Sequence, residues 1–403
     1  DAGAVLGTAM AIKMIAYIGV APIVGAYANR LPRRSFLIAM DLIRCLVALA
    51  LPFIDQVWQI YVLIFVLQSA SAGFTPTFQA TIPDVLPEEQ DYTKALSLSR
   101  LAYDMESLTS PMLAAALLTV MSFHWLFSGT AIGFACSALL VLTTVLPRAA
   151  ASRPTGGIYY NTTRGARLYL KTPRLRGLLA VTLAAAAASA MVIVNTPVLV
   201  QSALGRGQSA MAITLAAFGG GSMLAALLLP RLLERLSDRT VMLSAASAMT
   251  VTLAALALSW QDHAAPHYWG VILVGWLALG IAYSASITPG GRLLRRSSGG
   301  QDRPALFAAQ FALSHVCWLI AYPLAGQIGA FGGMGAAFAA AAVLALIGTV
   351  IAFRIWPSED AEVVAHRHDD LPLDHPHLLE GHPGGRARHA FVIDELHPRW
   401  PIQ

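Results

Sequence analysis

The sequence predicts an all-α protein that crosses a membrane eleven times. Of the 403 residues, 56% are hydrophobic and 12% are charged, whereas soluble domains carry about 25% charged residues. The mean hydropathy is +0.61, and the apolar residues form runs of the roughly 20 residues that a helix needs to cross a bilayer. These values argue against a soluble globular protein and exclude disorder over most of the length.

The apolar runs between polar residues mark the predicted spans. In chain order they cover residues 4–28, 35–53, 58–82, 94–120, 125–146, 175–200, 209–230, 240–260, 268–289, 304–327 and 334–356. The chain opens at Asp1 almost directly into the first run, with no charged segment before it, so we expect no signal peptide. We also expect one preceding helix to be missing, which would bring the total to twelve.

Cations gather in alternate connections between these spans. One set includes Arg30–Arg34, Arg231–Arg239 and Arg292–Arg303, whereas the opposite set offers Arg206 alone. The positive-inside rule predicts that the arginine-rich set and the C-terminal tail are cytoplasmic. Because the cations follow membrane topology, the expected partner is the lipid bilayer and not a nucleic acid, in spite of the net charge of +5.

The longest and most basic connection divides five visible spans from six. Within it Ile158, Tyr159 and Leu168 alternate with cations, which predicts a helix lying on the anionic inner leaflet. We therefore expect four parts: an N-terminal helix bundle at 1–146, a cytoplasmic linker at 147–173, a C-terminal bundle at 174–356 and a cytoplasmic tail at 357–403.

Two arginine-rich connections align without gaps at an offset of 205 residues. The first, Gly25–Arg34, reads GAYANRLPRR, and the second, Pro230–Arg239, reads PRLLERLSDR. Each follows one span and precedes another. This pattern indicates a parallel repeat of six helices, which is a known transporter architecture.

The first of these loops resembles the GxxxDRxGRR signature of the major facilitator superfamily. Gly25, Arg30, Arg33 and Arg34 match the signature, whereas Asn29 replaces its aspartate. The resemblance implies the major facilitator fold of two six-helix repeats, and a conformational latch that also includes the C-terminal residues Glu234, Arg235 and Arg239. Because Asn29 is uncharged, the latch is either weaker or relies on Asp84 or Glu88 of the neighbouring loop.

Two further segments narrow the resemblance. The segment beginning Ser110-Pro111 is similar to an antiporter motif of the fifth helix, with small residues in place of glycine, and an ordinary proline kink is the alternative. The sequence Ile82–Pro87 resembles the enterobactin-exporter-like branch. If these matches hold, the direction of transport is export.

Ionisable residues within the spans are candidates for the substrate and proton pathway, because they are costly at bilayer depth. Asp104 and His315 lie near the midplane, where transporter sites sit. Asp104 is the expected cavity residue, and Glu106, about 200° further around the helix, cannot line the same wall. Lys13 needs an anion, for which Asp104 or Glu106 is the candidate.

Four further polar residues within the spans are candidates for the same pathway, and each also has a structural interpretation. Asp41 and Arg44 are spaced to neutralise each other as an ion pair. Asn195 either lines the cavity or packs between helices. His315 is either a metal ligand with Cys317 or a hydrogen-bonded core histidine, and the two-residue spacing favours the second.

The tail is rich in histidine and carries carboxylates nearby. Its candidate ligands for a divalent metal are His366, His368, His375, His377 and His382. This composition resembles nickel-resistance permeases of the same superfamily, with a solvated tail that binds nothing as the alternative. The stretch from Ala390 to Trp400 is apolar enough to dock on another part of the chain.

Together these features predict a multi-pass exporter of the bacterial inner membrane, not an enzyme. Proton antiport through Asp104 is the expected mechanism, because substrate and proton would compete for one carboxylate. Nickel or cobalt is the first substrate candidate, and a hydrophobic drug or siderophore is the alternative. No Walker sequence or glycine-rich phosphate loop occurs, so we expect neither ATP drive nor a cofactor.

Overall fold

The computed structural model describes residues 2–28, 31–118, 120–147, 157–260, 268–359, 363–367 and 386–393, together with His397 and Trp400. The helices before the linker are α1 (Ala2–Tyr27), α2 (Arg33–Ala50), α3 (Val57–Val85), α4 (Glu89–Leu117) and α5 (Phe123–Thr143). Those that follow are α6 (Ile158–Lys171), α7 (Pro173–Pro197), α8 (Gln208–Leu233), α9 (Asp238–Ser259), α10 (Tyr268–Ile287), α11 (Gly290–Arg296) and α12 (Arg303–Ile355). A 3-10 turn (Leu51–Phe53) follows α2, and a π-helical turn (Val198–Ala203) follows α7.

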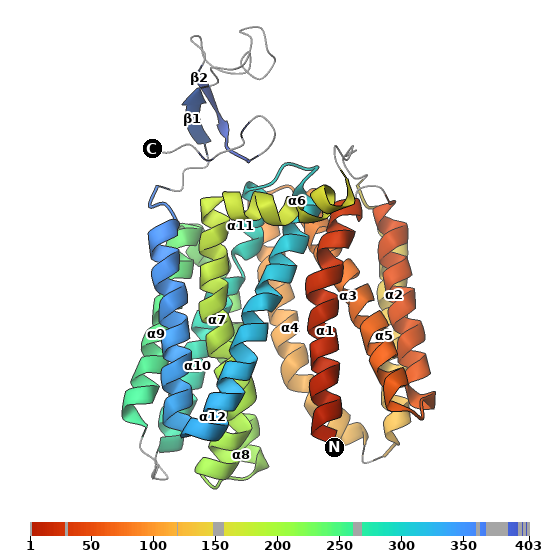
Figure 1. The fold of residues 1–403 in the computed structure, drawn as a ribbon, viewed down its shortest axis with the longest axis vertical. Coiled ribbons are helices and arrows are strands. Elements are labelled where there is room, and N and C mark those ends of the chain that lie inside the picture. Colours follow the sequence, from red (N-terminus) through yellow and green to blue (C-terminus); the bar gives the residue numbers. More distant parts are fainter. Residues whose placement is uncertain are drawn as a thin grey trace.

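The long helices stand side by side as two groups (Figure 1). In the first group α2 packs against α5 and α3, and α1 packs against α3; in the second, α12 and α10 hold α7, α8 and α9 together. The groups meet where α1 contacts α12 and where α4 contacts α8. We call the end of the bundle that carries α6, α11 and the C-terminal end of α12 the arginine-rich end; it is at the top of Figure 1.

The predicted spans are confirmed as helices. Nine helices of the described residues are long and apolar enough to cross a membrane. A further predicted span, 94–120, corresponds to α4, which is less apolar because Arg100, Asp104 and Glu106 lie near its middle. The eleventh comes from α12, which covers two predicted spans and is broken at Gly333, where φ is 78°. Only glycine adopts this backbone geometry at little cost.

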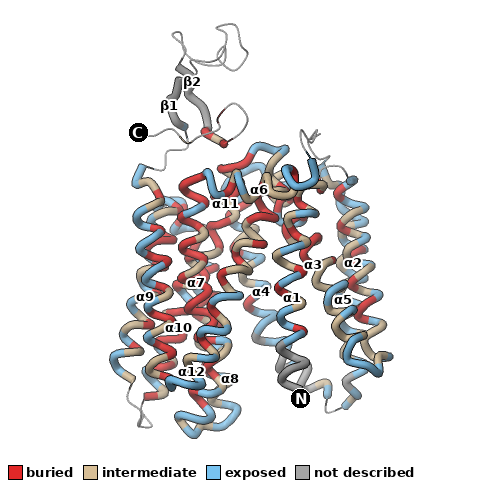
Figure 2. The backbone as a smooth tube through the Cα atoms, in the orientation of Figure 1, coloured by how far each residue is buried: buried red, intermediate tan, exposed pale blue. Residues whose placement is uncertain are grey.

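The burial pattern is that of a membrane protein. Large apolar side chains such as Leu46, Leu139 and Leu258 are exposed, and exposed stretches, pale blue in Figure 2, run along the outer helices of the bundle. The core lies within the second group, where α7 is almost entirely buried. Its small side chains allow close approach: a β-carbon at Gly348 of α12 would lie 2.5 Å from the carbonyl oxygen of Ala180.

The linker and the tail both form structure at the arginine-rich end. As predicted, the alternating segment is a helix, α6, which packs against α1 and α12. The tail adds a small antiparallel ladder to the all-α fold, in which β1 (Val363–Arg367) pairs with β2 (Arg386–Ala390). The residues between the two strands, 368–385, lie outside the described residues.

Candidate transport site and closed end of the bundle

Asp84 joins the two helix groups at the arginine-rich end. It forms ion pairs with Arg33 of α2 and with Arg303, the first residue of α12. Asp84 lies near the end of α3, so the second of these pairs connects the first group to the second. The sequence analysis named Asp84 as a possible substitute for the aspartate missing at position 29, and these contacts fit that role.

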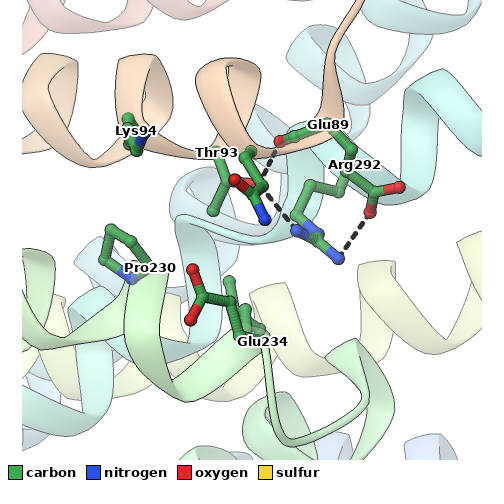
Figure 3. Close-up of a pocket in the computed structure, with 8 residues that line it drawn as sticks. Glu89, Thr93, Lys94, Pro230, Glu234 and Arg292 are labelled. Atoms are coloured by element: carbon green, nitrogen blue, oxygen red, sulfur yellow. Dashed lines mark hydrogen bonds and ion pairs between the residues drawn. The ribbon is translucent and has the colours of Figure 1, made fainter.

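Arg292 of α11 forms a second connection between the groups (Figure 3). Its guanidinium lies 2.6 Å from Glu89 Oε1 and donates a hydrogen bond of 2.6 Å to Thr93 Oγ1, both in α4. It also lies 2.9 Å from Asp238 Oδ1 at the start of α9. An adjacent cavity of about 420 Å³ is lined by residues of α4 and α8, by Glu234 directly after α8 and by Arg292.

The two aligned loops place opposite charges at the same repeat position. Arg33 in the first loop corresponds to Asp238 in the second, at the offset of 205 residues. Arg33 at the start of α2 pairs with Asp84 near the end of α3, and Asp238 at the start of α9 pairs with Arg292 and Arg296 of α11, which follows α10. In the ion pairs that cross between the groups, the acids Asp84 and Glu89 belong to the first group and the arginines Arg303 and Arg292 belong to the second.

The other predicted latch residues lie at the same end but make fewer contacts. Gly25 is buried against α12, and a β-carbon there would lie 2.4 Å from Ala308 Cβ. Arg239 donates a hydrogen bond to the backbone oxygen of Trp356. Arg34, Glu234 and Arg235 are exposed. Asn29 and Arg30 lie outside the described residues.

A central cavity of about 340 Å³ lies between the two groups, in the half of the bundle nearer the arginine-rich end. Its lining combines aromatic rings with uncharged polar groups. The residues that line it include Arg100, Tyr103, Thr182, Gln310, Phe311 and Trp318. Arg100 is the only charged residue among the lining residues that the structure describes.

Asp104 lies beside this cavity and connects α4 to α8. It is 3% exposed and accepts hydrogen bonds from Arg100 and from Ser222 Oγ, the latter at 2.5 Å. The Arg100 guanidinium lies 2.6 Å from Asp104 Oδ1 and rests on the rings of Tyr103 and Tyr283. Asp104 was expected to line the cavity. Arg100 lines it instead, and the Asp104 carboxylate neutralises the charge of Arg100.

The remaining charged candidates are distributed over different sites. Asp41 and Arg44 form the expected ion pair within α2, and Ser137 of α5 donates to Asp41 at 2.8 Å. Lys13 lies with its Nζ 5.5 Å from the centre of the Tyr17 ring. Within the described residues Lys13 forms an ion pair with neither Asp104 nor Glu106, the two anions expected for it, and Arg100 and Ser222 hold the Asp104 carboxylate instead. Glu106 is exposed.

His315 and Asn195 follow the packing alternatives. His315 Nδ1 lies 2.7 Å from the carbonyl oxygen of Phe311, and its ring contacts Tyr17. Asn195 donates hydrogen bonds to the backbone oxygen of Ala325 and to the sulfur of Met191. Neither residue is among those described as lining the central cavity. Across the described residues, no three His, Cys, Asp or Glu side chains are grouped to hold a metal ion.

Most of the predicted metal ligands of the tail lie outside the described residues. His368, His375, His377 and His382 lie outside the described residues, and His366 is placed only by its backbone in β1. The apolar stretch that was expected to dock does so: Phe391 and Ile393 are buried against Leu168 of α6 and Trp400. Arg174 of α7 donates to the backbone oxygen of Phe391.

Several residues of these sites were not among the candidates singled out from the sequence. Arg100 lies one helical turn before Asp104, a spacing that signals an ion pair. Ser222 carries no such signal, because its role depends on how α8 meets α4. Arg292 and Arg303 stood out only as topology-determining cations, and Asp238 only as part of the repeat.

A family model for the Major Facilitator Superfamily matches the chain over residues 2–258 and, in a second overlapping match, over residues 178–383. The chain belongs to this superfamily. The expected fold is confirmed, and the chain is a multi-pass membrane protein of a superfamily of transporters.

Curated relatives of this superfamily transporter include efflux proteins. It is 26% identical over 153 residues to a macrolide efflux protein A of Enterococcus faecalis, which covers 36% of this chain and 47% of the relative. It is 27% identical over 127 residues to the transporter YfiS of Bacillus subtilis, covering 32% of this chain and 30% of the relative. The chain thus spans less than half the length of these relatives.

Solved structures support the fold. The human organic anion transporter MFSD10 matches with a TM-score of 0.71 at 14% identity, over 87% of this chain and 83% of that one. An outward-facing bacterial homologue of the iron transporter ferroportin matches with a TM-score of 0.69 at 13% identity, over 87% and 90% of the two chains.

Proposed function

We propose that this transporter is a proton-coupled exporter of amphiphilic organic compounds in a bacterial inner membrane. The central cavity supports this substrate class most directly. Its aromatic rings suit an apolar body, whereas Gln310, Thr182 and Arg100 suit a few polar groups on the compound. The similarity to macrolide efflux proteins points in the same direction.

The arrangement of Asp104 supports the coupling. The carboxylate holds Ser222 of α8 and Arg100 of α4 at the contact between the two groups. A protonated Asp104 would lose the charge that attracts Arg100, so this contact would weaken and the arginine-rich end could open. Substrate entering from that end would then favour release of the proton, which is the exchange that an antiporter needs.

The arginine-rich end is the cytoplasmic end in this proposal, by the positive-inside rule. The ion pairs of Asp84 and Arg292 hold that end closed. The structure then corresponds to a state in which the cavity is shut off from the cytoplasm. Alternating access moves the two groups about this cavity.

A divalent metal such as nickel or cobalt is the second substrate candidate, and the histidines of the tail support it. Tethered near the arginine-rich end, they would raise the local metal concentration at the cavity entrance. The lining of the central cavity gives this candidate no support, since among its described residues only Arg100 is charged and none is a histidine or a carboxylate.

The two candidates are separated by substrate-induced proton release. The purified full chain is placed in proteoliposomes with the proton gradient imposed, and a macrolide, a lipophilic organic cation and Ni²⁺ are each added. We expect proton movement with one of the organic compounds and none with Ni²⁺. Coupled movement with Ni²⁺ alone, lost in a chain ending at Trp356, would instead establish the metal candidate.

A further inference from the structure

Another cavity, of about 220 Å³, lies at the arginine-rich end and shares Glu89 and Arg292 with the cavity of Figure 3. It is bounded by α4, α11, the start of α12 and the tail residue Val392. Four arginines line it: Arg292, Arg295, Arg296 and Arg303. The one carboxylate among its described lining residues is Glu89.

The ion pairs around this cavity leave an excess of positive charge. The network contains Asp84, Glu89 and Asp238, and each of these acids is bound to Arg33, Arg292, Arg296 or Arg303. Among the described residues Arg295 has no carboxylate partner: it donates to the backbone oxygen of Pro87 and lies over the Tyr92 ring. Within that part of the chain five arginines thus face three acids, which leaves two positive charges because arginine does not lose its proton in proteins.

Several buried donors at the cavity lack a hydrogen-bond partner within the part of the chain that the structure describes. They include Nη1 of Arg295, Nε of Arg303 and the hydroxyl of Tyr92. Tyr92 is completely buried. Buried donors are nearly always paired in folded proteins, so this set of unpaired donors indicates that an acceptor group belongs here.

We propose that this cavity binds a phosphate group, carried either by a soluble phosphate ester or by a lipid head group. A phosphate dianion matches the two excess charges, and its oxygens accept hydrogen bonds from several guanidinium groups at once. The tyrosine hydroxyl supplies one further donor. The bound group would contact α4 of the first helix group and α11 and α12 of the second.

Such a ligand stabilises the state that is closed at the arginine-rich end. The site exists only while α4 lies against α11 and α12, so its binding free energy favours that arrangement. Occupancy would therefore slow transport cycles that open this end. This inference does not depend on the exported substrate, because phosphate binding is measured without it.

The test is thermal unfolding of the full chain in detergent, with inorganic phosphate added at a constant ionic strength set by sodium chloride. We expect the unfolding midpoint to rise along a saturable curve. In Arg295→Gln the concentration for half the effect should rise by at least about tenfold. Arg231→Gln is the matched control, because Arg231 is an exposed arginine at the same end, and it should behave as the wild type.

A second variant keeps the proposal testable if Arg295→Gln folds poorly. Tyr92→Phe removes only the unpaired hydroxyl and should raise the half-effect concentration about two- to tenfold. Absence of any midpoint shift in the wild type, beyond that of matched chloride, overturns the proposal. An equal shift in the wild type and in Tyr92→Phe and Arg295→Gln overturns the assignment to this cavity.

Two further arms identify the source of the group. If nanodiscs containing phosphatidic acid raise the midpoint over phosphatidylcholine nanodiscs and abolish the effect of phosphate, the ligand is a lipid head group. If phosphate acts equally in both nanodiscs, it is a soluble ester. Asp394 and Glu395 follow Val392 in the sequence. Stabilisation by phosphate only after both are changed to Asn and Gln would mean that these acids fill the cavity, and would refute the proposal.

Discussion

At the residue scale, the proposed proton coupling depends on the contact of Asp104 with Arg100 and Ser222. A buried carboxylate in a membrane protein is costly unless it is paired, and here both its partners are present. Ser222 belongs to the other helix group, so the same carboxylate that neutralises Arg100 also ties the groups together. Protonation would affect both functions at once.

Asp104→Asn tests this residue directly. Asparagine keeps the size and can still bond Ser222, but it cannot lose a proton or attract Arg100. We expect the variant to fold, to exchange substrate down a gradient, and to lose nearly all export driven by a proton gradient. Transport in proteoliposomes after a pH jump measures this. Glu106→Gln is the control, since Glu106 is exposed on the same helix, and it should retain export.

Uphill export by Asp104→Asn at the wild-type rate would remove Asp104 from the coupling. Sequence reasoning could identify this residue, because an acid at mid-span is rare. It could not identify Ser222, which is one hydroxyl among many in the spans. It offered Asp104 or Glu106 as the anion for Lys13 and did not weigh Arg100 as the partner of Asp104, although Arg100 lies one helical turn before Asp104 at a spacing that favours an ion pair.

At the scale of the elements, close helix packing depends on a few glycines. A β-carbon at Gly221 of α8 would lie 2.2 Å from the carbonyl oxygen of Leu277 in α10, whereas one at Gly220 would meet nothing within 4 Å. These neighbours are therefore a matched pair for the same substitution on two faces of one helix.

We expect Gly221→Ala to destabilise the protein by about 1–3 kcal/mol, because the backbones of α8 and α10 must separate. Gly220→Ala should be neutral or slightly stabilising, since alanine favours the helix by about 1 kcal/mol over glycine. Thermal unfolding in detergent checks both. Equal loss of stability in the two variants would contradict the packing of α8 on α10.

Apolar runs predicted the spans well because helix length and hydropathy are local properties of the chain. The two spans of α12 were separated correctly, and Gly333 makes the separation. The short α11 was not predicted, since seven residues such as Gly290–Arg296 carry too little pattern to distinguish a helix from a loop. The docking of Phe391 on α6 was expected only in general terms, because its partner surface is not local.

At the scale of the whole molecule, complementary charges hold one end of the two groups together. Asp84 and Glu89 of the first group pair with Arg303 and Arg292 of the second. The repeat accounts for this pattern, because Arg33 and Asp238 occupy equivalent positions with opposite charge. One end is therefore closed by ion pairs that can separate and reform, as alternating access requires.

The orientation of the molecule is tested by labelling single cysteines in intact cells, after Cys45, Cys136 and Cys317 are replaced. A cysteine at Asp262 should react with an impermeant reagent from outside. A cysteine at Arg235, which is exposed at the arginine-rich end, should react only after the membrane is permeabilised. Reaction of the second position in intact cells would reverse the proposed topology.

In the proposed mechanism, protonation of Asp104 allows the two helix groups to separate at the arginine-rich end. This step is tested most directly by the distance between spin labels at Gln90 of α4 and Arg235 beyond α8, both exposed at that end. In the wild type we expect a single short distance at high pH and a growing population of longer distances as the pH falls. In Asp104→Asn we expect the longer distances at every pH. A distance distribution that is unchanged by pH in the wild type, and identical in Asp104→Asn, would contradict this mechanism.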